Sequence, residues 1–282
     1  MGKPGTLGIY LIAHDLEAYD YPFIEALDSA LPIADELVIN ECGSTDGTLA
    51  ALQAWAQKSS KVQIVQSEWI DNWRQLAVLG NYCVPFLKTE WAWQLQADEI
   101  IHEDSYREIR RRIHEDYGND PDITAMNVHY THFVANYETT FPFQYDRLVR
   151  IARRGRGWQL IGDACHLAGG DPRGVVDTSI QVFHYGKVHA GSTAWQKEWD
   201  FQQLFRDNGF PDPKMQEMRQ KLGEQFCDYL YLFRDYFNRG EFKQFEGRHP
   251  QVMNKRIAAA KLGGWEQFQS RMQEALCLQN SK

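Results

Sequence analysis

The chain has 282 residues, of which 43% are hydrophobic and 24% are charged, and its formal net charge is -8 at pH 7. These proportions are typical of a folded chain with a sizeable core, in one large domain or in a domain with an appendage, and they exclude a largely disordered protein. The negative charge argues against a duplex nucleic-acid binder, which usually carries a basic face.

The cysteines and the apolar runs bear on the compartment of the protein. The cysteines number five and are scattered without a CxxC motif, which favours reduced thiols over a disulfide framework or a zinc site. No run approaches the roughly 20 apolar residues of a membrane span, and the first residues do not resemble a signal peptide. We therefore expect a cytoplasmic protein without a transmembrane segment, for which peripheral membrane contact stays open.

The first hundred residues alternate strand and helix patterns. Helix starts are predicted at Asp20 and at Thr45 or Asp46, because such side chains cap helices, and Pro85 should kink or end a third helix. Apolar runs predict four strands, at residues 7–13, 36–40, 61–65 and 91–95. This order predicts an α/β fold with a mostly parallel, Rossmann-like sheet, right-handed crossovers and helices on both faces.

The pattern changes after residue 120. Ser105 and Glu108, just before this point, have the spacing of a capping box and predict a fourth helix. From Trp195 onward apolar residues recur every three or four positions, as in the stripe from Met215 to Phe237, which predicts a helical C-terminal appendage. Between these regions we expect strands at 123–134, 148–151 and 180–185, a solvated basic turn or local anion contact at 150–156, and a glycine-rich loop at 155–174.

An acidic segment ends the second predicted strand. Residues 41–48 (ECGSTDGT) place Glu41 at the strand end and Asp46 in the turn before a helix. In an open α/β sheet ligands sit outside the carboxyl ends of strands, and a helix start adds free N–H groups. Carboxylate oxygens at this place could accept hydrogen bonds from a nucleobase and a ribose. The same spacing also fits an ordinary capped turn, and both interpretations stay open.

A second acidic segment ends the fourth predicted strand, where Asp98 and Glu99 follow the aromatic run WAWQLQA. Mg²⁺ and Mn²⁺ prefer oxygen ligands and often keep substrate phosphates in their shell, so a metal here would neutralise charge on a diphosphate leaving group. Asp98 could instead only cap the turn before the next helix. If the two acidic strand ends meet in space, they predict an enzyme for an activated, diphosphate-bearing substrate.

Together these segments resemble glycosyltransferase family 2 enzymes of the GT-A fold. In that family the second strand typically ends D-D-G-S-T-D-G-T and the fourth ends L-D-A-D-E, which residues 41–48 and 95–99 match with changes. Residues 158–166 (WQLIGDACH) stand in place of W-x-G-x-x-H, and residues 183–188 (FHYGKV) are close to F-H-Y-G-W-V of small bacterial members. The resemblance implies a GT-A nucleotide-sugar-binding and catalytic domain at residues 1–190, followed by a helical extension at 191–282.

The resemblance also implies roles for individual residues. Asp98 would ligate Mn²⁺ or Mg²⁺, and His184 would complete the metal shell, although a core histidine is equally expected there. Family members that invert the anomeric carbon use a carboxylate to deprotonate the acceptor hydroxyl, and Asp163 is the first choice for this base, with Asp177 second. The implied nucleotide-binding residues are Glu41, Asp46, Asn81 and Ala97.

Three positions depart from the family pattern and leave two functions open. Gln96 and Cys42 each stand where the family has an Asp, and Gly80 stands where it has an Arg. The first function is an inverting, metal-dependent glycosyltransferase that uses a nucleoside-diphosphate sugar, with a UDP-sugar expected, and a glycan, lipid or protein acceptor. The second is a non-catalytic nucleotide-sugar-binding relative of the same fold. A nucleotidyltransferase is disfavoured, because it would need a glycine-rich basic loop where residues 14–17 are HDLE.

Overall fold

The computed structural model of the protein describes residues 2–70, 72–117, 120–142, 145–189, 191–204 and 239–277. The chain forms two compact units, each assembled from separate stretches of sequence. The first comprises Met1–Tyr130, Tyr145–Phe183 and His249–Met253, and the second comprises Thr131–Gln144, His184–Arg248 and Asn254–Lys282.

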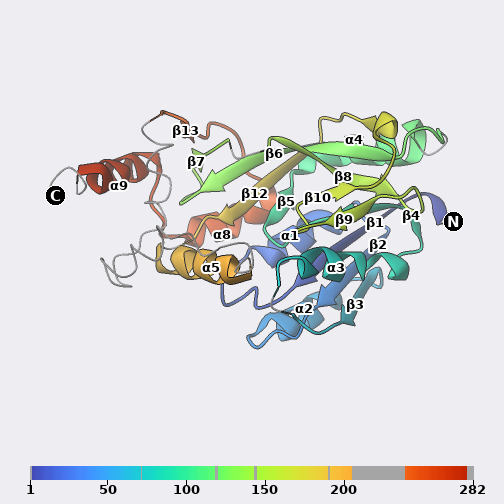
Figure 1. Ribbon diagram of the computed structural model, residues 1–282. Helices are drawn as coiled ribbons and strands as arrows, with labels where there is room; N and C mark the ends of the chain where they lie inside the picture. The colour runs from blue at the N-terminus through green and yellow to red at the C-terminus, as the bar shows by residue number, and fades with distance from the viewer. Residues whose placement is uncertain are drawn as a thin grey trace. The chain divides into compact units, whose positions relative to one another are not determined.

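A mostly parallel sheet forms the centre of the first unit (Figure 1). Its parallel strands are β1 (Lys3–Ala13), β2 (Glu36–Glu41), β3 (Val62–Gln66) and β4 (Thr89–Gln94), in the spatial order β4-β1-β2-β3. Since β1 lies between β2 and β4 and all three run in one direction, their carboxyl ends meet at the same edge of the sheet. The predicted α/β fold with a mostly parallel sheet is confirmed.

Further strands extend this sheet beyond β4, with β8 antiparallel to both of its neighbours and β11 parallel to β6. The strand β8 pairs with both β4 and β6, while β11 pairs with β6 and β5 pairs with β12. The strands expected after residue 120 are therefore present, with ends shifted by a few residues. The five further strands named in this paragraph are β5 (Glu99–Ile101), β6 (Ala125–Val134), β8 (Arg147–Arg153), β11 (Val175–Val176) and β12 (Gln181–Lys187).

Helices cover both faces of the parallel strands, as expected. Because side chains alternate along a strand, β1 sends Leu7, Ile9 and Leu11 into one apolar cluster and Tyr10 into another. The first cluster takes buried residues from α1, α2 and α4, and the second takes them from α3. The bounds are α1 (Phe23–Ala30), α2 (Thr48–Ala56), α3 (Gln75–Asn81) and α4 (Tyr106–Arg111), with a 3₁₀ turn at Val84–Phe86 where Pro85 was expected to end the helix.

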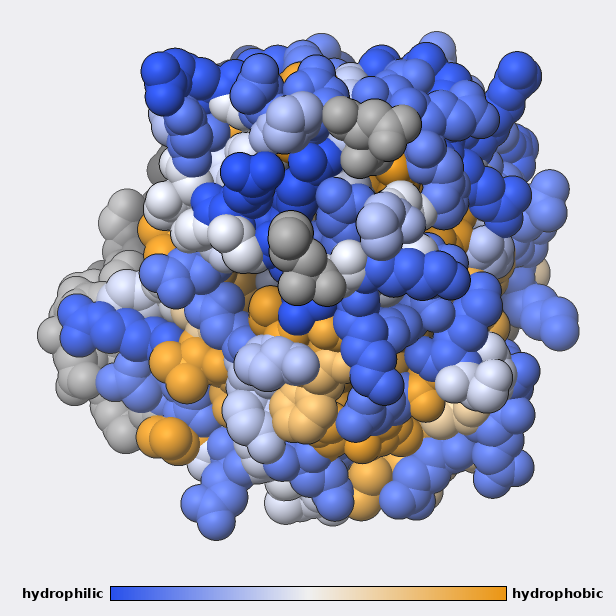
Figure 2. All heavy atoms as spheres, turned by 90° about the vertical axis from the view of Figure 1, so that its right-hand side faces the viewer, coloured by the Kyte–Doolittle hydropathy of each residue, from blue (hydrophilic) through white to orange (hydrophobic). Residues whose placement is uncertain are grey.

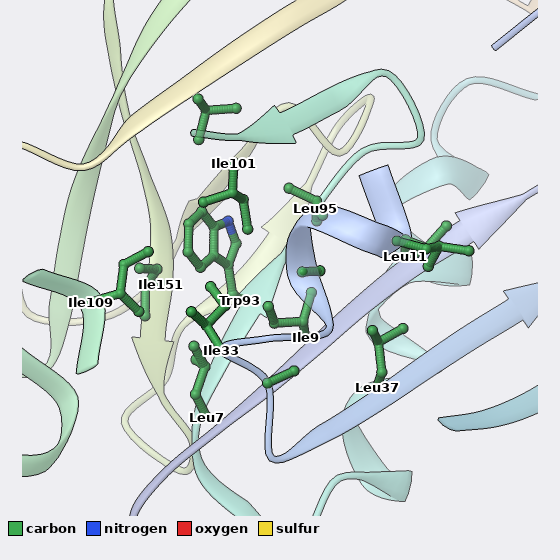
Figure 3. Packing of buried hydrophobic residues seen from close by; sticks show 14 of the residues in the cluster. Leu7, Ile9, Leu11, Ile33, Leu37, Trp93, Leu95, Ile101, Ile109 and Ile151 are labelled. Atoms are coloured by element: carbon green, nitrogen blue, oxygen red, sulfur yellow. The ribbon is translucent and has the colours of Figure 1, made fainter. Parts of the chain in front are cut away.

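The first cluster is the main core of this unit. Trp91, Trp93 and Leu95 of the aromatic run all lie in it with no exposed surface, which confirms that they share one side of β4. Figure 3 shows Trp93 and Leu95 among the branched aliphatic side chains of this cluster. Full burial of one large apolar side chain contributes about 1.5–3 kcal/mol, so this core holds the end of β4 firmly.

Apolar residues are less prominent on the outside. Hydrophilic residues cover most of the face seen in Figure 2, with smaller hydrophobic areas between them. Within the described ranges, no helix combines the length and the apolar character that crossing a membrane requires.

Two expected helix caps are wrong because other contacts take the polar groups. Asp20 has a φ of 51°, and α1 begins only at Phe23, without a side-chain cap. Ser105 is already inside a helical turn that begins at Glu103, and its Oγ accepts a hydrogen bond from the Gln181 N–H (2.9 Å). The capping-box spacing therefore matched a segment in which a long-range contact uses the serine.

The region expected as a glycine-rich loop contains an antiparallel hairpin. Its strands are β9 (Gln159–Ile161) and β10 (His166–Ala168), followed by a 3₁₀ turn at Pro172–Gly174. The solvated basic turn expected at 150–156 is wrong for Arg150 and Arg153, which are buried on β8, whereas a turn does follow β8 and Arg156 is exposed. Charge alone did not reveal that Arg150 and Arg153 have buried partners.

The second unit holds short strands, helices and its own apolar cluster. Phe268 and Met272, which belong to an expected helical stripe, are buried there with Phe141 and Phe242. The stripe from Met215 to Phe237 lies outside the described residues, and the domain division at residue 190 stays a prediction. The described elements are β7 (Thr139–Thr140), β13 (Lys243–Gln244), α5 (Gly191–Leu204), α8 (Asn254–Ala259) and α9 (Trp265–Cys277).

Candidate functional site

The loops that follow β1 and β2 hold each other at the carboxyl edge of the sheet. The Thr45 N–H donates to Asp15 Oδ1 (2.6 Å), and the Asp15 N–H donates to Ser44 Oγ (3.1 Å). Asp15 has a φ of 45°, in the left-handed region that aspartate tolerates better than most residues. This reciprocal pair fixes the turn after β2 against the end of β1.

Asp46 lies in the same turn and binds backbone groups of both loops. Its Oδ1 accepts from the Thr48 N–H at the start of α2 (2.8 Å), and its Oδ2 accepts from the Ala18 N–H (2.8 Å). Burial acts to raise the pKa of Asp46, but the hydrogen bonds from Thr48 and Ala18 outweigh it, and the pKa is lowered. Asp46 thus binds the first N–H group of α2, although Gly47 occupies the N-cap position, and its contact with a nucleotide stays a prediction.

Glu41, the last residue of β2, is 1% exposed. Its Oε1 accepts from the Ser44 N–H (2.6 Å), and its Oε2 accepts from Gln66 Nε2 (3.2 Å). Burial acts to raise the pKa of Glu41, but the hydrogen bonds from Ser44 and Gln66 prevail and lower it. The end of β2 therefore carries an ionised carboxylate at neutral pH.

Two stacked aromatic side chains lie at the end of β1, one from the loop after β1 and one from the loop after β3, and the sequence did not single them out. The rings of His14 and Trp69 stack with their centroids 4.1 Å apart and an interplanar angle of 5°. His14 Nδ1 lies 2.8 Å from the Cys42 carbonyl oxygen, and because a carbonyl only accepts, Nδ1 carries the proton. His14 directly follows the first buried strand, so the rule that ligands sit at strand ends could have found it.

The acidic turn after β4 separates its two carboxylates into different roles. Glu99 is 1% exposed and forms a buried ion pair with Arg150 (2.8 Å), while its Oε2 also accepts from the Gln96 N–H (2.9 Å). Asp98 lies between Gln96 and Glu99 in the sequence and is 8% exposed. Burial raises the pKa of Tyr145, and the charge of Asp98 contributes to the same shift. Glu99 is thus a structural residue, and the metal-binding role of Asp98 stays a prediction.

Arg150 also brings a distant loop to this turn. Its Nη1 donates to the carbonyl oxygens of Ala164 (3.3 Å) and Cys165 (2.6 Å), in the loop between β9 and β10. Asp163 belongs to that loop, and its Oδ1 accepts from the Cys165 N–H (3.3 Å). Burial and the neighbouring Asp163 raise the pKa of the Cys165 thiol to about 12. The thiol is therefore neutral, and the first-choice base lies in a loop tied to the Asp98 turn.

Asp177, the second-choice base, has different surroundings. Its carboxylate forms an ion pair with Arg147 (2.7 Å) and lies 3.5 Å from His129 Nε2, with 53% of the side chain exposed. Burial acts to raise the pKa of Asp177, but the contacts with Arg147 and His129 together outweigh it, and the pKa is lowered. A carboxylate paired with arginine is a weaker base, so this geometry favours Asp163.

His184 lies in the second unit, whereas Asp98 lies in the first, so their joint role as metal ligands stays a prediction. The Nδ1 atoms of His184 and His132 are 3.2 Å apart, and the ring centroids are 5.0 Å apart. In this contact one Nδ1 donates and the other accepts, so the two rings do not both carry a proton there.

A metal ion at the candidate site would depend on side chains that could act as its ligands. No group of three or more His, Cys, Asp or Glu side chains that could hold an ion occurs in the part of the chain that the structure describes. Mg²⁺ usually binds through one or two carboxylates plus substrate phosphates, without a full protein cage. A single buried carboxylate at Asp98, completed by a substrate diphosphate, fits this kind of metal binding.

Two residues assigned to the nucleotide are engaged in the fold. The Asn81 side chain donates to the Leu160 carbonyl (2.9 Å) and accepts from the Leu160 N–H (2.9 Å), which fastens α3 to β9. Ala97 packs its side chain in the main core cluster. The nucleotide contacts of Asn81 and Ala97 stay predictions, and for Ala97 they would involve its backbone.

Two of the three departures from the family pattern have packing reasons. A Cβ on Gly80 would lie 2.3 Å from Leu160 Cδ1, so a larger residue would require the Leu160 side chain to shift. Cys42 has no exposed surface, and burial raises the pKa of its thiol to about 11. An aspartate at position 42 would be a buried carboxylate, so neither change removes a charge from an exposed position.

Comparisons with known proteins give one sequence relative. No family profile matches the chain. The chain is 24% identical over 161 residues to the lipopolysaccharide core biosynthesis glycosyltransferase LpsC of Rhizobium meliloti (strain 1021), across 57% of this chain and 55% of that protein. The chain therefore spans about half the length of the relative that it matches.

Solved structures overlap the chain only loosely. The S. aureus TarS 1–349 structure in complex with UDP is 11% identical, with 96% of this chain and 87% of that chain covered at a TM-score of 0.44. The mannosyltransferase PcManGT from Pyrobaculum calidifontis, in complex with GDP-Man and Mn²⁺, is 13% identical, with 98% and 86% covered at a TM-score of 0.41. At these identities and TM-scores the overlaps carry no functional inference.

Proposed function

We propose that the protein is an inverting glycosyltransferase of family 2 that moves a sugar from a nucleoside-diphosphate sugar, with UDP as the expected nucleotide, to an acceptor hydroxyl. The observation that carries the proposal is the meeting of strand ends in the first unit. Glu41 ends β2 and Asp98 follows β4, and both strands flank β1 in parallel. The sequence similarity to a lipopolysaccharide core glycosyltransferase supports the same activity.

The nucleoside would bind at the loops after β1 and β2. Glu41 is ionised, and each of its oxygens accepts one of the hydrogen bonds described above. A carboxylate oxygen has further lone pairs, so Glu41 can accept from a nucleobase N–H or a ribose hydroxyl. Asp46 and the start of α2 lie in the same turn and would support the ribose.

The diphosphate would lie beside the turn after β4. Asp98 would hold a Mn²⁺ or Mg²⁺ ion, and such an ion supplies positive charge that stabilises the leaving diphosphate. The ion pair with Arg150 removes Glu99 from this role. The protein thus contributes one carboxylate there, together with the fixed geometry of the turn.

Asp163 would act as the general base of the transfer. The acceptor oxygen forms a bond with the anomeric carbon from the face opposite the diphosphate, and the bond from that carbon to the diphosphate oxygen breaks. The hydroxyl proton passes to the Asp163 carboxylate. Attack from the opposite face inverts the anomeric configuration.

A second candidate function is a binding protein that keeps the nucleotide-sugar site without transfer. The observation that favours it is the neutral Gln96 in the turn that holds Asp98, since Glu99 is already paired with Arg150. This arrangement leaves fewer charges for a metal than the family pattern has. Such a protein would bind a sugar nucleotide and release no sugar.

Calorimetry with UDP and with GDP, each with and without Mn²⁺, tests both candidates. It is followed by a panel of UDP-sugars, scored for sugar release to water and for transfer to a lipopolysaccharide core saccharide. A glycosyltransferase binds nucleotide more tightly with Mn²⁺ and releases sugar, whereas a binding protein shows affinity without turnover. No nucleotide binding under either metal condition overturns both candidates.

A further inference from the structure

We infer that Arg150 is a positioning residue, which holds the Asp98 turn and the Asp163 loop in a fixed relation. The catalytic meaning of this inference rests on the proposed function. Its structural part rests only on the contacts of a buried guanidinium group that links three segments of the first unit.

The Arg150 side chain has no exposed surface, and all three nitrogens of its guanidinium group donate hydrogen bonds. Nε donates to the Gln94 carbonyl at the end of β4 (3.2 Å). Nη1 donates to the carbonyls of Ala164 (3.3 Å) and Cys165 (2.6 Å), and Nη2 donates to Glu99 Oε1 (3.0 Å) and Oε2 (2.8 Å). Arg150 therefore touches the end of β4, the acidic turn and the β9–β10 loop at once.

Glu99 passes this restraint to the acidic turn. The Gln96 N–H donates to Glu99 Oε2 (2.9 Å), and the Glu99 N–H donates to the Gln96 carbonyl (3.1 Å). These two bonds close the turn in which Asp98 lies. A shift of the Glu99 carboxylate would therefore move the backbone that presents Asp98.

The β9–β10 loop is restrained through two consecutive carbonyl groups. Ala164 has a φ of 62°, a left-handed conformation that alanine rarely adopts without support. The bonds from Arg150 to the Ala164 and Cys165 carbonyls stabilise this conformation. Asp163 directly precedes them, so its carboxylate position depends on the same guanidinium group.

Lysine cannot replace these contacts. A lysine ammonium is a point charge with three donors, whereas the planar guanidinium group reaches acceptors in several directions with a fixed geometry. Arg150→Lys keeps the charge beside Glu99 but leaves part of the carbonyl set unpaired. The two loops would then lose their common restraint.

Arg153 offers a matched control on the same strand. It is also buried (7% exposed), and its Nε lies 3.4 Å from Glu90 Oε1. It donates to the Tyr117 carbonyl and lies 4.7 Å above the Trp91 ring. These contacts involve neither the acidic turn nor the β9–β10 loop, so Arg153→Lys perturbs a buried arginine without touching the candidate site.

Hydrogen exchange tests the structural part without any ligand. We expect Arg150→Lys to lose amide protection in residues 94–101 and 159–168 together, whereas Arg153→Lys keeps both segments protected. The double variant Glu99→Leu/Arg150→Met should show the same paired loss, and it guards against unfolding because apolar replacement of a buried ion pair is often tolerated. Unchanged protection in both segments, or loosening of only one, overturns the inference.

Calorimetry and turnover test the catalytic part. In Arg150→Lys, the gain in UDP affinity on adding Mn²⁺ and the kcat for transfer should each fall by about ten- to a hundredfold, as for other groups that orient metal ligands. UDP affinity without metal should match that of Arg153→Lys, because the Glu41 end is untouched. Equal metal-dependent affinity and kcat in the two variants would overturn the positioning role. A wild-type protein that binds no nucleotide would overturn the proposed function instead, and the exchange result would stand.

Discussion

The carboxyl ends of β2 and β4 hold their acidic residues in different ways. At β2, Glu41 and Asp46 accept hydrogen bonds from backbone and amide N–H groups, and these bonds lower the pKa of both. At β4, Glu99 is paired with Arg150, which lies 51 residues away in sequence, and Asp98 follows a strand whose two tryptophans have no exposed surface. The first end relies on many short contacts between two loops, and the second relies on one buried ion pair.

The difference predicts how each end responds to substitution. When several hydrogen bonds share the restraint, the loss of one carboxylate leaves the others in place. When a buried ion pair loses one partner, the other remains as an uncompensated charge among unsatisfied carbonyl groups. We therefore expect large, coupled effects around β4 and smaller, separable effects around β2.

The largest effect is expected at the loop that Arg150 ties to β4. Asp163→Asn should lower kcat for sugar transfer by about a hundred- to ten-thousandfold, the range for loss of a general base, and leave nucleotide affinity unchanged. Asp177→Asn is the matched control, because Asp177 is exposed and paired with Arg147. Transfer kinetics beside calorimetry decide between them, and a greater loss of kcat in Asp177→Asn would reverse the assignment.

The second effect concerns stability. Glu99→Ala should lower the free energy of unfolding by about 3–5 kcal/mol, because it leaves the Arg150 charge buried without its partner. Glu90 forms the ion pair with Arg153, and its side chain is 18% exposed. Glu90→Ala should therefore lower the free energy of unfolding by less than Glu99→Ala does. Urea unfolding of the two variants measures the difference. Equal losses would mean that the ion pair of Glu99 with Arg150 stabilises the fold no more than the ion pair of Glu90 with Arg153.

The same contrast explains what the sequence could predict. The turn at Asp46 is a local motif, and the mostly parallel sheet followed from the alternation of apolar runs with helix patterns. The ion pair of Arg150 with Glu99 is long-range, and the arginine lies in a run that looks like a solvated turn. The strands β9 and β10 were missed because each has only three residues among glycines, and because β9 is supported by Asn81, 79 residues away from Leu160.

For the candidate site, too, the sequence predicted the strand-end residues and missed a contact between distant residues. Glu41 and Asp98 were selected because they end strands, and the structure brings those strand ends to one edge of the sheet. The stacked pair of His14 and Trp69 was missed because Trp69 reaches the end of β1 from the loop after β3, a contact that no short motif encodes. The choice between Asp163 and Asp177 as the proposed base depends on the ion pair of Asp177 with Arg147, which the sequence does not show.

The third effect separates the two strand ends by their ligands. Asp98→Asn should reduce the Mn²⁺-dependent part of UDP affinity by about ten- to a hundredfold and leave the metal-free part unchanged. Glu41→Gln should do the reverse, because Glu41 lies at the proposed nucleoside end, although the change also replaces an oxygen that accepts from Ser44 or Gln66. Calorimetry of both variants with and without Mn²⁺ checks the pair. If both variants reduce the same part of the affinity, the two ends do not serve different portions of the donor.

The smallest effect is a pH dependence of stability at the β2 end. A carboxyl whose folded pKa lies below its unfolded value, about 4 for Asp and Glu, stabilises the fold above that value. The contribution is lost as the pH falls through the lower folded pKa. Since the pKa values of Glu41 and Asp46 are both lowered, wild-type stability should fall as the pH drops below about 4.

Two substitutions of Asp46 separate its charge from its hydrogen bonds. Asp46→Asn keeps an acceptor for one of the two N–H groups and cannot ionise, so it should show a smaller fall in stability on acidification than the wild type. Asp46→Ala also loses the acceptor at the start of α2 and should be less stable at neutral pH by about 1 kcal/mol. Urea unfolding at several pH values measures both quantities. An unchanged pH dependence in Asp46→Asn would mean that the charge at this end of β2 contributes nothing to stability, and that the hydrogen bonds between the two loops alone hold the turn.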